Sequence, residues 1–237
     1  MNAASVRSGA EDGQKRAAAL RAVDEVEDGM VLGLGTGTTM AFVLDVLAAR
    51  IAKGLKVVGI PTSNRTEDRA QQLGIPLTNF AAHRSIDLAL DGADEVEEGS
   101  LNLIKGAGGA LLREKIVAAA SKRLVIIVDE TKIVQRLGTH RPVPVEMASF
   151  GWQNVLDRLA AAGMAPTLRT IGGEPFRTDG GNYIADCAFA GIDEPARLDE
   201  RLKAIVGVIE SGIFVGLATR IVVGGTGGVT ILERKLS

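Results

Sequence analysis

Residues 31–40 read VLGLGTGTTM, and the helix-forming run AFVLDVLAARI follows directly at residues 41–51. The apolar start predicts a strand, the glycines a tight turn, and the run behind them a helix. In such a unit, free backbone N–H groups and the helix dipole point toward the turn, which makes it a standard site for an anion. The stretch therefore predicts an α/β fold with an anion site after its first strand.

The rest of the first half repeats this pattern. Strand-like runs at 55–60, 86–90 and 123–128 alternate with helix-like runs at 63–74 and 109–122. Such alternation favours right-handed crossovers and a Rossmann-like, doubly wound and mainly parallel sheet with helices on both faces. Ligands of such sheets bind beyond the carboxyl ends of the strands. We therefore look for function in the segments that follow each strand.

The second half has a different pattern. Residues 141–147, RPVPVEM, carry two prolines, which suit an edge strand. They open a βαββαβ-like order, which predicts a smaller α+β, ferredoxin-like domain inserted into the first. We place the Rossmann-like catalytic domain at residues 1–134 and 208–237, and the inserted domain at residues 135–207.

Two glycine-containing segments of the second half predict turns. Residues 220–232, RIVVGGTGGVTIL, predict a hairpin in which Gly224 to Gly228 form the turn and hold no phosphate. Asp179 to Gly181 predict a turn between two strands of the inserted domain.

Composition excludes several classes of function. The 237 residues are 46% hydrophobic and only 3% aromatic, with 27 basic and 29 acidic residues, so neither a nucleic-acid nor a membrane partner is expected. No apolar run approaches the ~20 residues of a spanning helix, and the first dozen residues do not resemble a secretory signal. One cysteine, Cys187, excludes an internal disulfide, and two histidines cannot complete a zinc-type cluster. We expect a soluble cytoplasmic protein with Cys187 in its core.

The first glycine turn does not match a nucleotide fingerprint. A dinucleotide G-x-G-x-x-G from Gly33 would need glycine at Thr38, and no Walker lysine is present. The hydroxyls of Thr36, Thr38 and Thr39 can add donors to the backbone cradle, which fits a single small phosphate better than a dinucleotide. The alternative is a tight turn capped by threonine, without a ligand.

A second segment, LALDGADEVEEGSLNLIKGAGGALLREK at residues 88–115, carries the richest chemistry. Its strand ends in Asp91 and Asp94, which flank Gly92, so that backbone can approach a ligand while both carboxylates reach outward. Hydroxyl groups of a sugar are natural partners for such a pair. Lys105 and a second glycine loop follow.

A divalent metal is the alternative ligand of this acidic run. Hard cations prefer carboxylate oxygens, but Lys105 would compete and the spacing of a calcium loop is absent. We therefore assign no metal. Glu95, Glu97 and Glu98 fit a solvated loop, and we assign them no role.

Glu114 lies in the first turns of the next predicted helix, just after Lys105 and the glycines. A carboxylate base, a lysine electrophile and a phosphate-binding turn are the parts that a sugar phosphate isomerase needs. A third segment, VIIVDETK at residues 125–132, ends a strand at Asp129 and offers Lys132 as a further charge for phosphate. The alternative there is a helix cap followed by an exposed lysine.

Together these segments resemble the ribose-5-phosphate isomerase family of type A. The matching motifs run in order from Lys15 onward: GLGTGTT, PTSNRTEDRA, DGADEVEEGSLNLIKGAGGALLREK, VDETK, PVEM, TDGGNYIADC and ESGIF. The resemblance implies interconversion of D-ribose 5-phosphate and D-ribulose 5-phosphate through an enediolate, in the pentose phosphate pathway. It also implies no metal or organic cofactor, and a homodimer or homotetramer associated through the smaller domain.

The resemblance also implies roles for individual residues. Glu114 would be the base, Lys105 would face the sugar oxygens, and Asp91 with Asp94 would bind hydroxyls and assist ring opening. The threonine turn with Lys132, and more loosely Lys15, would hold the phosphate. The residues implied to bind substrate are Thr36, Gly37, Thr38, Thr39, Asp91, Gly92, Ala93, Asp94, Lys105, Gly106, Ala107, Gly108, Lys132 and Lys15.

Three positions depart from the pattern of the family. Thr38 stands where serine is common and keeps the hydroxyl. Ala107 interrupts a run of glycines, and we expect a negative φ there, because a positive φ would strain alanine by about 1 kcal/mol or more. Gly180 stands where asparagine is common, so any side-chain contact from that position is lost.

Two other classes of function compete with this interpretation. A sugar phosphate sensor of a transcription regulator would need a DNA-reading segment, and the acidic, alanine-rich N-terminus supplies none. A related amino sugar phosphate deaminase or coenzyme A transferase is the other class. The deaminases usually rely on histidine, whereas His83 and His140 lie outside the predicted ligand loops.

Overall fold

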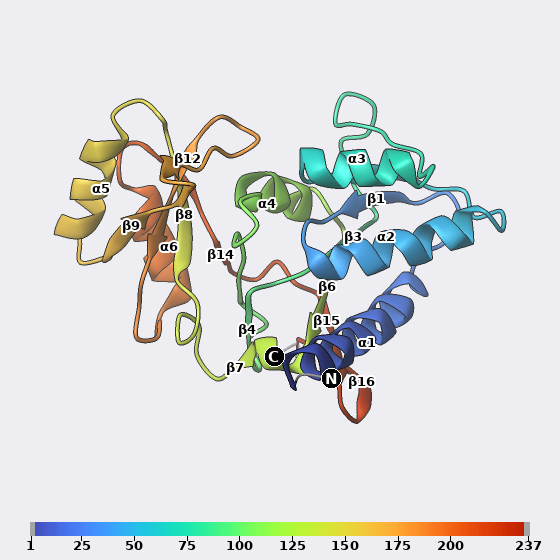
Figure 1. Ribbon diagram of the computed structural model, residues 1–237. Helices are drawn as coiled ribbons and strands as arrows, with labels where there is room; N and C mark the ends of the chain where they lie inside the picture. The colour runs from blue at the N-terminus through green and yellow to red at the C-terminus, as the bar shows by residue number, and fades with distance from the viewer. Residues whose placement is uncertain (1–2, 235–237) are drawn as a thin grey trace.

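A computed structural model describes residues 3–234, and the side chains from residue 12 onward. Its elements form two groups (Figure 1), a large sheet with its helices at the right and a smaller sheet with its helices at the left. Within the described residues, no helix is both long and apolar enough to cross a membrane.

The large sheet is Rossmann-like and mainly parallel, as predicted. Its order is β16-β15-β6-β3-β1-β2, and only β16 runs antiparallel to its neighbour. The strands are β1 (Val31–Leu34), β2 (Val58–Pro61), β3 (Leu88–Asp91), β6 (Leu124–Asp129), β15 (Arg220–Gly225) and β16 (Gly228–Glu233). Because β2 and β3 lie on opposite sides of β1, the strand order reverses at β1 and β3. Ligands of open α/β sheets bind at such a point.

Helices and a third sheet cover the two faces of the large sheet. The helices α1 (Ala3–Val23), α2 (Thr38–Ile51) and α3 (Asn64–Gln72) share one apolar cluster with Leu88 and Leu90 of β3. The intervening Ala89 faces the opposite cluster, to which α4 (Leu111–Ala119) contributes. This alternation of side chains along β3 is the period of two expected for a strand buried on both faces.

The smaller sheet has the predicted ferredoxin-like order. It is antiparallel, in the order β13-β8-β12-β9, and the chain runs β8-α5-β9-β12-α6-β13. The bounds are β8 (Val143–Met147), α5 (Trp152–Ala161), β9 (Pro166–Leu168), β12 (Tyr183–Cys187), α6 (Pro195–Lys203) and β13 (Val208–Ser211), with the short strands β10 (Thr170–Ile171) and β11 (Glu174–Pro175) between β9 and β12. Cys187 is buried in this core, as expected.

A third sheet, which the sequence did not predict, joins the two groups. Its order is β14-β5-β4-β7. The strands are β4 (Glu95–Glu97), β5 (Leu103–Ile104), β7 (Ile133–Val134) and β14 (Ile213–Phe214), and the 3₁₀ helix η1 (Glu130–Lys132) precedes β7. Strands of two or three residues are too short to show a periodic pattern in sequence.

Two expectations about the strands of the smaller sheet need correction. The strand β8 is not an edge strand, because it lies between β13 and β12. Its Pro144 pairs with Asp186 of β12, but its carbonyl accepts the N–H of Gly212 at 2.6 Å on the opposite side, where the pairing with β13 begins only at Val145. Since the N–H of a strand residue faces the same side as its carbonyl, proline removes no ladder bond to β12. The strand β13 pairs with β8 and lies in the smaller sheet, although we had placed residues 208–237 in the first domain.

The two predicted turns are present. The hairpin of β15 and β16 turns between Gly225 and Gly228, whereas Gly224 lies within β15. In the smaller sheet, the N–H of Gly181 donates to the carbonyl of Thr178 at 2.9 Å and closes the turn.

The expectation that Glu95 lies in a solvated loop is wrong. Its side chain is buried and accepts backbone N–H bonds from Gly138 at 2.6 Å, His140 at 2.7 Å and Arg141 at 2.8 Å. These residues form the segment that leads into β8. Glu95 therefore fixes the path of the chain from the large sheet to the smaller one.

We expect Glu95→Gln to lower the free energy of unfolding by about 2–3 kcal/mol, since an amide cannot replace a carboxylate that accepts three N–H bonds. Glu98→Gln is the matched control, because Glu98 is exposed three residues away, and it should change stability by no more than about 0.5 kcal/mol. Urea unfolding of both variants measures this difference. Equal losses in the two variants would contradict the assignment.

Candidate active site

The threonine turn is built by two glycines with different constraints. A Cβ on Gly35 would lie 2.1 Å from Oδ1 of Asp91, so only glycine lets that carboxylate lie against the turn. Gly37 is the N-cap of α2 and has φ of 131°, which favours glycine. No side chain caps α2, so the threonine-capped turn, the alternative without a ligand, is wrong. The first amides of α2 are left free for an anion.

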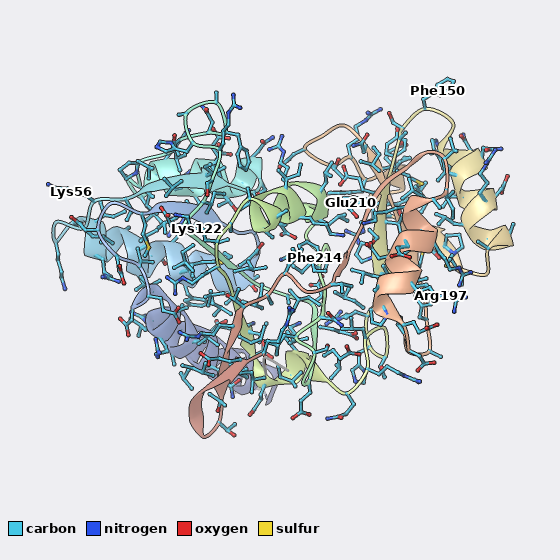
Figure 2. The ribbon with its side chains drawn as sticks, turned by 180° about the vertical axis from the view of Figure 1, so that it is seen from behind. Lys56, Lys122, Phe150, Arg197, Glu210 and Phe214 are labelled. Atoms are coloured by element: carbon cyan, nitrogen blue, oxygen red, sulfur yellow. The ribbon has the colours of Figure 1, made fainter. Side chains whose placement is uncertain are left out.

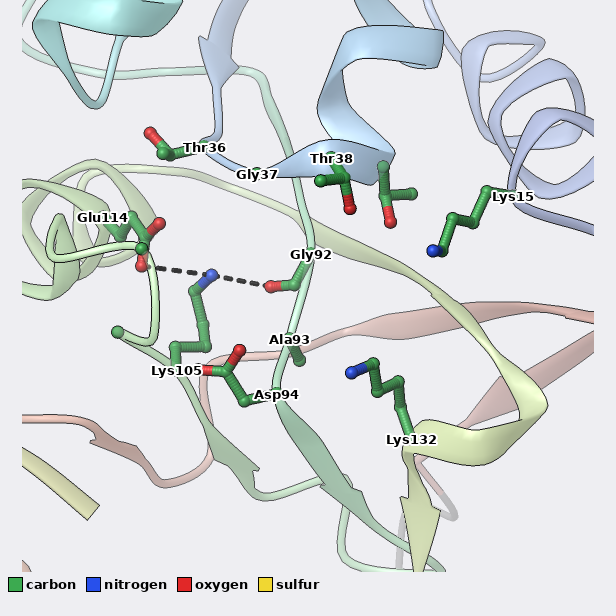
Figure 3. Close-up of a pocket in the computed structure, with 13 residues that line it drawn as sticks. Lys15, Thr36, Gly37, Thr38, Gly92, Ala93, Asp94, Lys105, Glu114 and Lys132 are labelled. Atoms are coloured by element: carbon green, nitrogen blue, oxygen red, sulfur yellow. Dashed lines mark hydrogen bonds and ion pairs between the residues drawn. The ribbon is translucent and has the colours of Figure 1, made fainter. Parts of the chain in front are cut away.

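The three threonines of the turn do not act alike. The hydroxyl of Thr36 is buried and hydrogen-bonds to the hydroxyls of Thr62 at 2.8 Å, Ser63 at 2.8 Å and Thr66 at 3.2 Å. Figure 3 shows it pointing away from Thr38. The hydroxyl of Thr36 is thus engaged within the protein although the residue lines the pocket, and a phosphate contact from this side chain stays a prediction.

Lys105 is the centre of a buried ionic cluster. Its Nζ lies 2.6 Å from the carbonyl oxygen of Gly92, 3.1 Å from Oδ2 of Asp91 and 3.2 Å from Oε2 of Glu114. The exposed fractions of Lys105, Asp91 and Glu114 are only 3%, 3% and 4%. Charges this deeply buried persist in proteins only when they are paired.

Asp91 lies behind Lys105 and does not line the pocket. Its Oδ1 accepts the N–H of Thr36 at 3.2 Å and that of Gly92 at 2.8 Å, while Oδ2 faces Lys105. In this structure both oxygens of Asp91 have protein partners, and the expectation that it binds sugar hydroxyls stays a prediction. Asp94 does line the pocket.

Burial raises the pKa of Glu114 to about 8. The positive charge of Lys105 opposes this shift, and the negative charges of Asp91 and Asp94 add to it. Burial also raises the pKa of Asp91 against the effect of Lys105. For Lys105, burial alone would lower the pKa, but the three carboxylates together raise it. Lys105 is thus a permanent cation beside a carboxyl group poised to exchange a proton near neutral pH.

Oε2 of Glu114 has an additional property. Among the described side chains it is the buried polar atom without a hydrogen bond, although it forms the ion pair with Lys105. A buried acceptor without a hydrogen-bonded partner is costly for stability. Such an atom is available to a ligand proton.

These groups meet in one cavity of about 130 Å³. Figure 3 shows Glu114, Lys105 and Asp94 on one side, and Thr38, Lys15 and Lys132 on the other. The lining residues are Lys15, Thr36, Gly37, Thr38, Thr39, Gly92, Ala93, Asp94, Lys105, Gly106, Gly108, Glu114 and Lys132. Of the residues predicted to bind substrate, only Asp91 and Ala107 are missing from this wall.

The second glycine loop, residues 106–109, accommodates Ala107 without backbone strain. Gly106 and Gly109 have φ of 109° and 81°, whereas Ala107 is not among the residues with positive φ, as expected. The N–H of Ala107 donates to Oδ2 of Asp94 at 2.9 Å. Ala107 thus contributes its backbone to the site by orienting a carboxylate that lines the pocket.

Gly224 contributes to the site, although its sequence pattern predicted only a turn. A Cβ on Gly224 would lie 2.2 Å from the carbonyl oxygen of Gln14, so this glycine allows α1 to pack closely on β15. The close approach brings Lys15, the next residue of α1, to the pocket. A glycine inside a strand pattern is a known signal for such an approach.

No metal site emerges from the described residues. Among the side chains of residues 12–234, no group of three or more His, Cys, Asp or Glu is arranged to hold a metal ion. His83 hydrogen-bonds to Thr78 at 2.9 Å and is not among the pocket residues. His140 is not among them either.

Comparison with known proteins agrees with this geometry. The family model for ribose 5-phosphate isomerase A, also called phosphoriboisomerase A, matches residues 58–228. The chain belongs to the ribose 5-phosphate isomerase A family. This family interconverts ribose 5-phosphate and ribulose 5-phosphate, and the chain is an isomerase of this kind.

Individual relatives are similar over nearly the whole chain. A ribose-5-phosphate isomerase A of Gloeobacter violaceus is 56% identical over 92% of this chain and 95% of its own length. One from Gluconobacter oxydans is 55% identical, over 91% of this chain and 94% of its own. The solved structure of the Plasmodium falciparum enzyme, 41% identical, superposes with a TM-score of 0.91 over 95% of this chain and all of its own.

We expect the pKa of Glu114 to be measurable as the loss of a protonated-carboxyl infrared band when the pH rises through about 8. The carboxyl group is neutral below this pH and charged above it, so the band is present on the acidic side. It should be absent from Glu114→Gln at every pH. Loss of the band near the ordinary value of 4.5 would contradict the effect of burial.

Proposed function

We propose that Glu114 carries the proton in the isomerisation of a phosphorylated aldose to its ketose. The observation that supports this most strongly is the position of Glu114, buried against a permanent cation at one end of a pocket whose other end carries two lysines. A base of raised pKa near the working pH is efficient in general acid–base catalysis.

The proposed reaction begins with the open-chain aldehyde. The Glu114 carboxylate takes the proton from C2, the C–H electron pair forms a C1–C2 double bond, and the C1 oxygen becomes an oxyanion. A proton then moves from the C2 hydroxyl to the C1 oxygen. Glu114 returns its proton to C1, and the C2 oxygen becomes the ketone. One carboxyl group between the two carbons thus performs both transfers.

Lys105 is proposed to stabilise the oxyanion of the enediolate. Its charge is fixed before the reaction by Asp91 and Glu114, so little reorganisation is needed when negative charge develops. Asp94, held by the N–H of Ala107, is proposed to bind a sugar hydroxyl and to assist ring opening. Asp91 is proposed to act through Lys105 and not on the sugar itself.

The opposite end is proposed to bind phosphate. The N-terminus of α2 with Thr38 and Thr39, and the ammonium groups of Lys15 and Lys132, all line this end. A related ribose-5-phosphate isomerase, 39% identical over 94% of this chain, was solved in complex with phospho-erythronic acid. Such a ligand combines a phosphate with a carboxylate, whose two oxygens resemble those of an enediolate. The same two anionic ends suit this pocket.

We also propose that the enzyme acts in the cytoplasm, in the pentose phosphate pathway, and forms a homodimer or homotetramer through the smaller sheet and its helices. Large apolar side chains are exposed there: Phe150 at 95%, Val206 at 77% and Ile171 at 67%. Figure 2 shows Phe150 at the tip of the loop that leads to α5, directed away from the rest of the chain. Exposed apolar groups of this size favour an association surface.

Glu114→Gln should lower kcat for ribose 5-phosphate by at least ~100-fold and change KM by less than about tenfold, because the amide cannot accept a proton but keeps the shape of the pocket. A coupled assay of ketopentose formation measures both constants. Glu130→Gln, an exposed glutamate outside the pocket, should keep wild-type constants.

In the wild type, kcat/KM should rise with pH to a plateau above about 8, because only the ionised carboxylate is a base. Near-normal turnover by Glu114→Gln would remove Glu114 from its proposed role.

Lys132→Met should raise KM for ribose 5-phosphate and weaken inhibition by inorganic phosphate, each by about tenfold or more, with a smaller effect on kcat. The reason is the loss of one charge-assisted contact at the phosphate end. Lys122→Met is the matched control, because Lys122 pairs with Asp87 at the surface and does not line the pocket. Unchanged phosphate inhibition in Lys132→Met would show that this lysine binds elsewhere.

A further inference from the structure

Arg169 connects the smaller sheet to the catalytic glycine loop. It lies between β9 and β10, and its Nη1 donates to the carbonyl oxygens of Gly106 at 2.8 Å and Ala107 at 3.1 Å. Its remaining nitrogens bind the carboxylate of Asp186 in β12, with Nε 2.9 Å from Oδ2. The side chains of Arg169 and Asp186 are only 15% and 24% exposed. This guanidinium is therefore fixed on one side before it holds the loop on the other.

The two carbonyl contacts determine where the loop amides point. In a trans peptide the C=O and the following N–H point in opposite directions. With the Gly106 carbonyl held by Arg169, the N–H of Ala107 points the other way, and it donates to Asp94 at 2.9 Å. By the same geometry, the Ala107 carbonyl directs the N–H of Gly108 away from Arg169. Gly108 lines the pocket.

The ring of Phe176 lies against the same loop. A Cβ on Gly109 would lie 2.4 Å from the ring of Phe176, which follows β11. The Arg169 guanidinium lies 5.9 Å from the centroid of that ring, and the N–H of Phe176 donates to the Arg169 carbonyl at 2.9 Å. Arg169 and Phe176 both lie outside the large sheet, and together they hold the loop in place.

We propose that Arg169 is a positioning residue for the reaction, which fixes the loop so that its amides face Asp94 and the sugar oxygens. The inference rests on the proposed function, because it gives the amides of this loop a role at the reacting end of the sugar. Arginine is required because its planar fork reaches two carbonyls and a carboxylate at once, whereas lysine offers a single point of attachment.

The test separates positioning from general stabilisation by comparing the two ends of the pocket. Arg169 touches the loop at the reacting end and none of the lysines or threonines at the phosphate end. Arg169→Ala and Arg169→Lys should lower kcat by about 10- to 100-fold, as expected when catalytic groups are misplaced. The inhibition constant of inorganic phosphate should stay within about threefold of the wild-type value.

Chemical rescue provides a second readout. Guanidinium ion, added below denaturing concentration, should raise kcat of Arg169→Ala by filling the site between Asp186 and the two carbonyls. It should not raise kcat of Arg169→Lys or Glu114→Gln. Arg177→Ala is the matched control, because Arg177 lies in the same region but binds Gly181 and Tyr183 and not the loop. It should keep wild-type kcat.

Two results would overturn the inference. One is wild-type kcat in a folded Arg169 variant, and the other is a joint loss of kcat and phosphate inhibition, which indicates a general structural role. If Arg169→Ala does not fold, Arg169→Lys and Asp186→Asn carry the same test. Failure of the proposed function is distinguishable, since Glu114→Gln would then keep near-normal kcat whatever the Arg169 variants do.

Discussion

The buried ammonium group of Lys105 is the constraint on which the rest of the structure depends. A lysine that is 3% exposed must be paired, and Asp91 and Glu114 supply the opposite charges within 3.2 Å. Burial raises the pKa of Glu114 to about 8 against the opposing charge of Lys105, and the negative charges of Asp91 and Asp94 add to the shift. One arrangement of charge therefore sets the properties of both the proposed electrophile, Lys105, and the proposed base, Glu114.

Each neighbouring element is adapted to this cluster. Gly35 leaves room for Asp91, whose Oδ1 also binds the amides of Thr36 and Gly92. The same carboxylate thus holds together the turn after β1 and the end of β3. Because parallel strands end at one edge of the sheet, the groups proposed to bind phosphate and those proposed to act in catalysis lie in a single cavity.

The smaller sheet contributes to this site as well as to the proposed association. Gly212 lies where the chain returns from the smaller sheet. Its carbonyl accepts the N–H of Lys105 at 2.9 Å, and the N–H of Gly212 donates to the carbonyl of Pro144 at 2.6 Å. A Cβ on Gly212 would lie 2.2 Å from the Lys105 carbonyl oxygen. Arg169 and Glu95 add further connections. Movement of the smaller sheet would therefore displace Lys105 and the glycine loop that follows it.

The Rossmann-like sheet, the ferredoxin-like segment and most of the pocket could be predicted from the sequence, because repeating apolar patterns and the motif around Lys105 are local signals. The folded chain was needed to learn that the Thr36 hydroxyl turns inward, that Asp91 lies behind Lys105, and that Glu95 is a buried anchor. The direction of a polar side chain depends on which donors the distant chain brings to it. That information is not contained in the spacing of residues along the sequence.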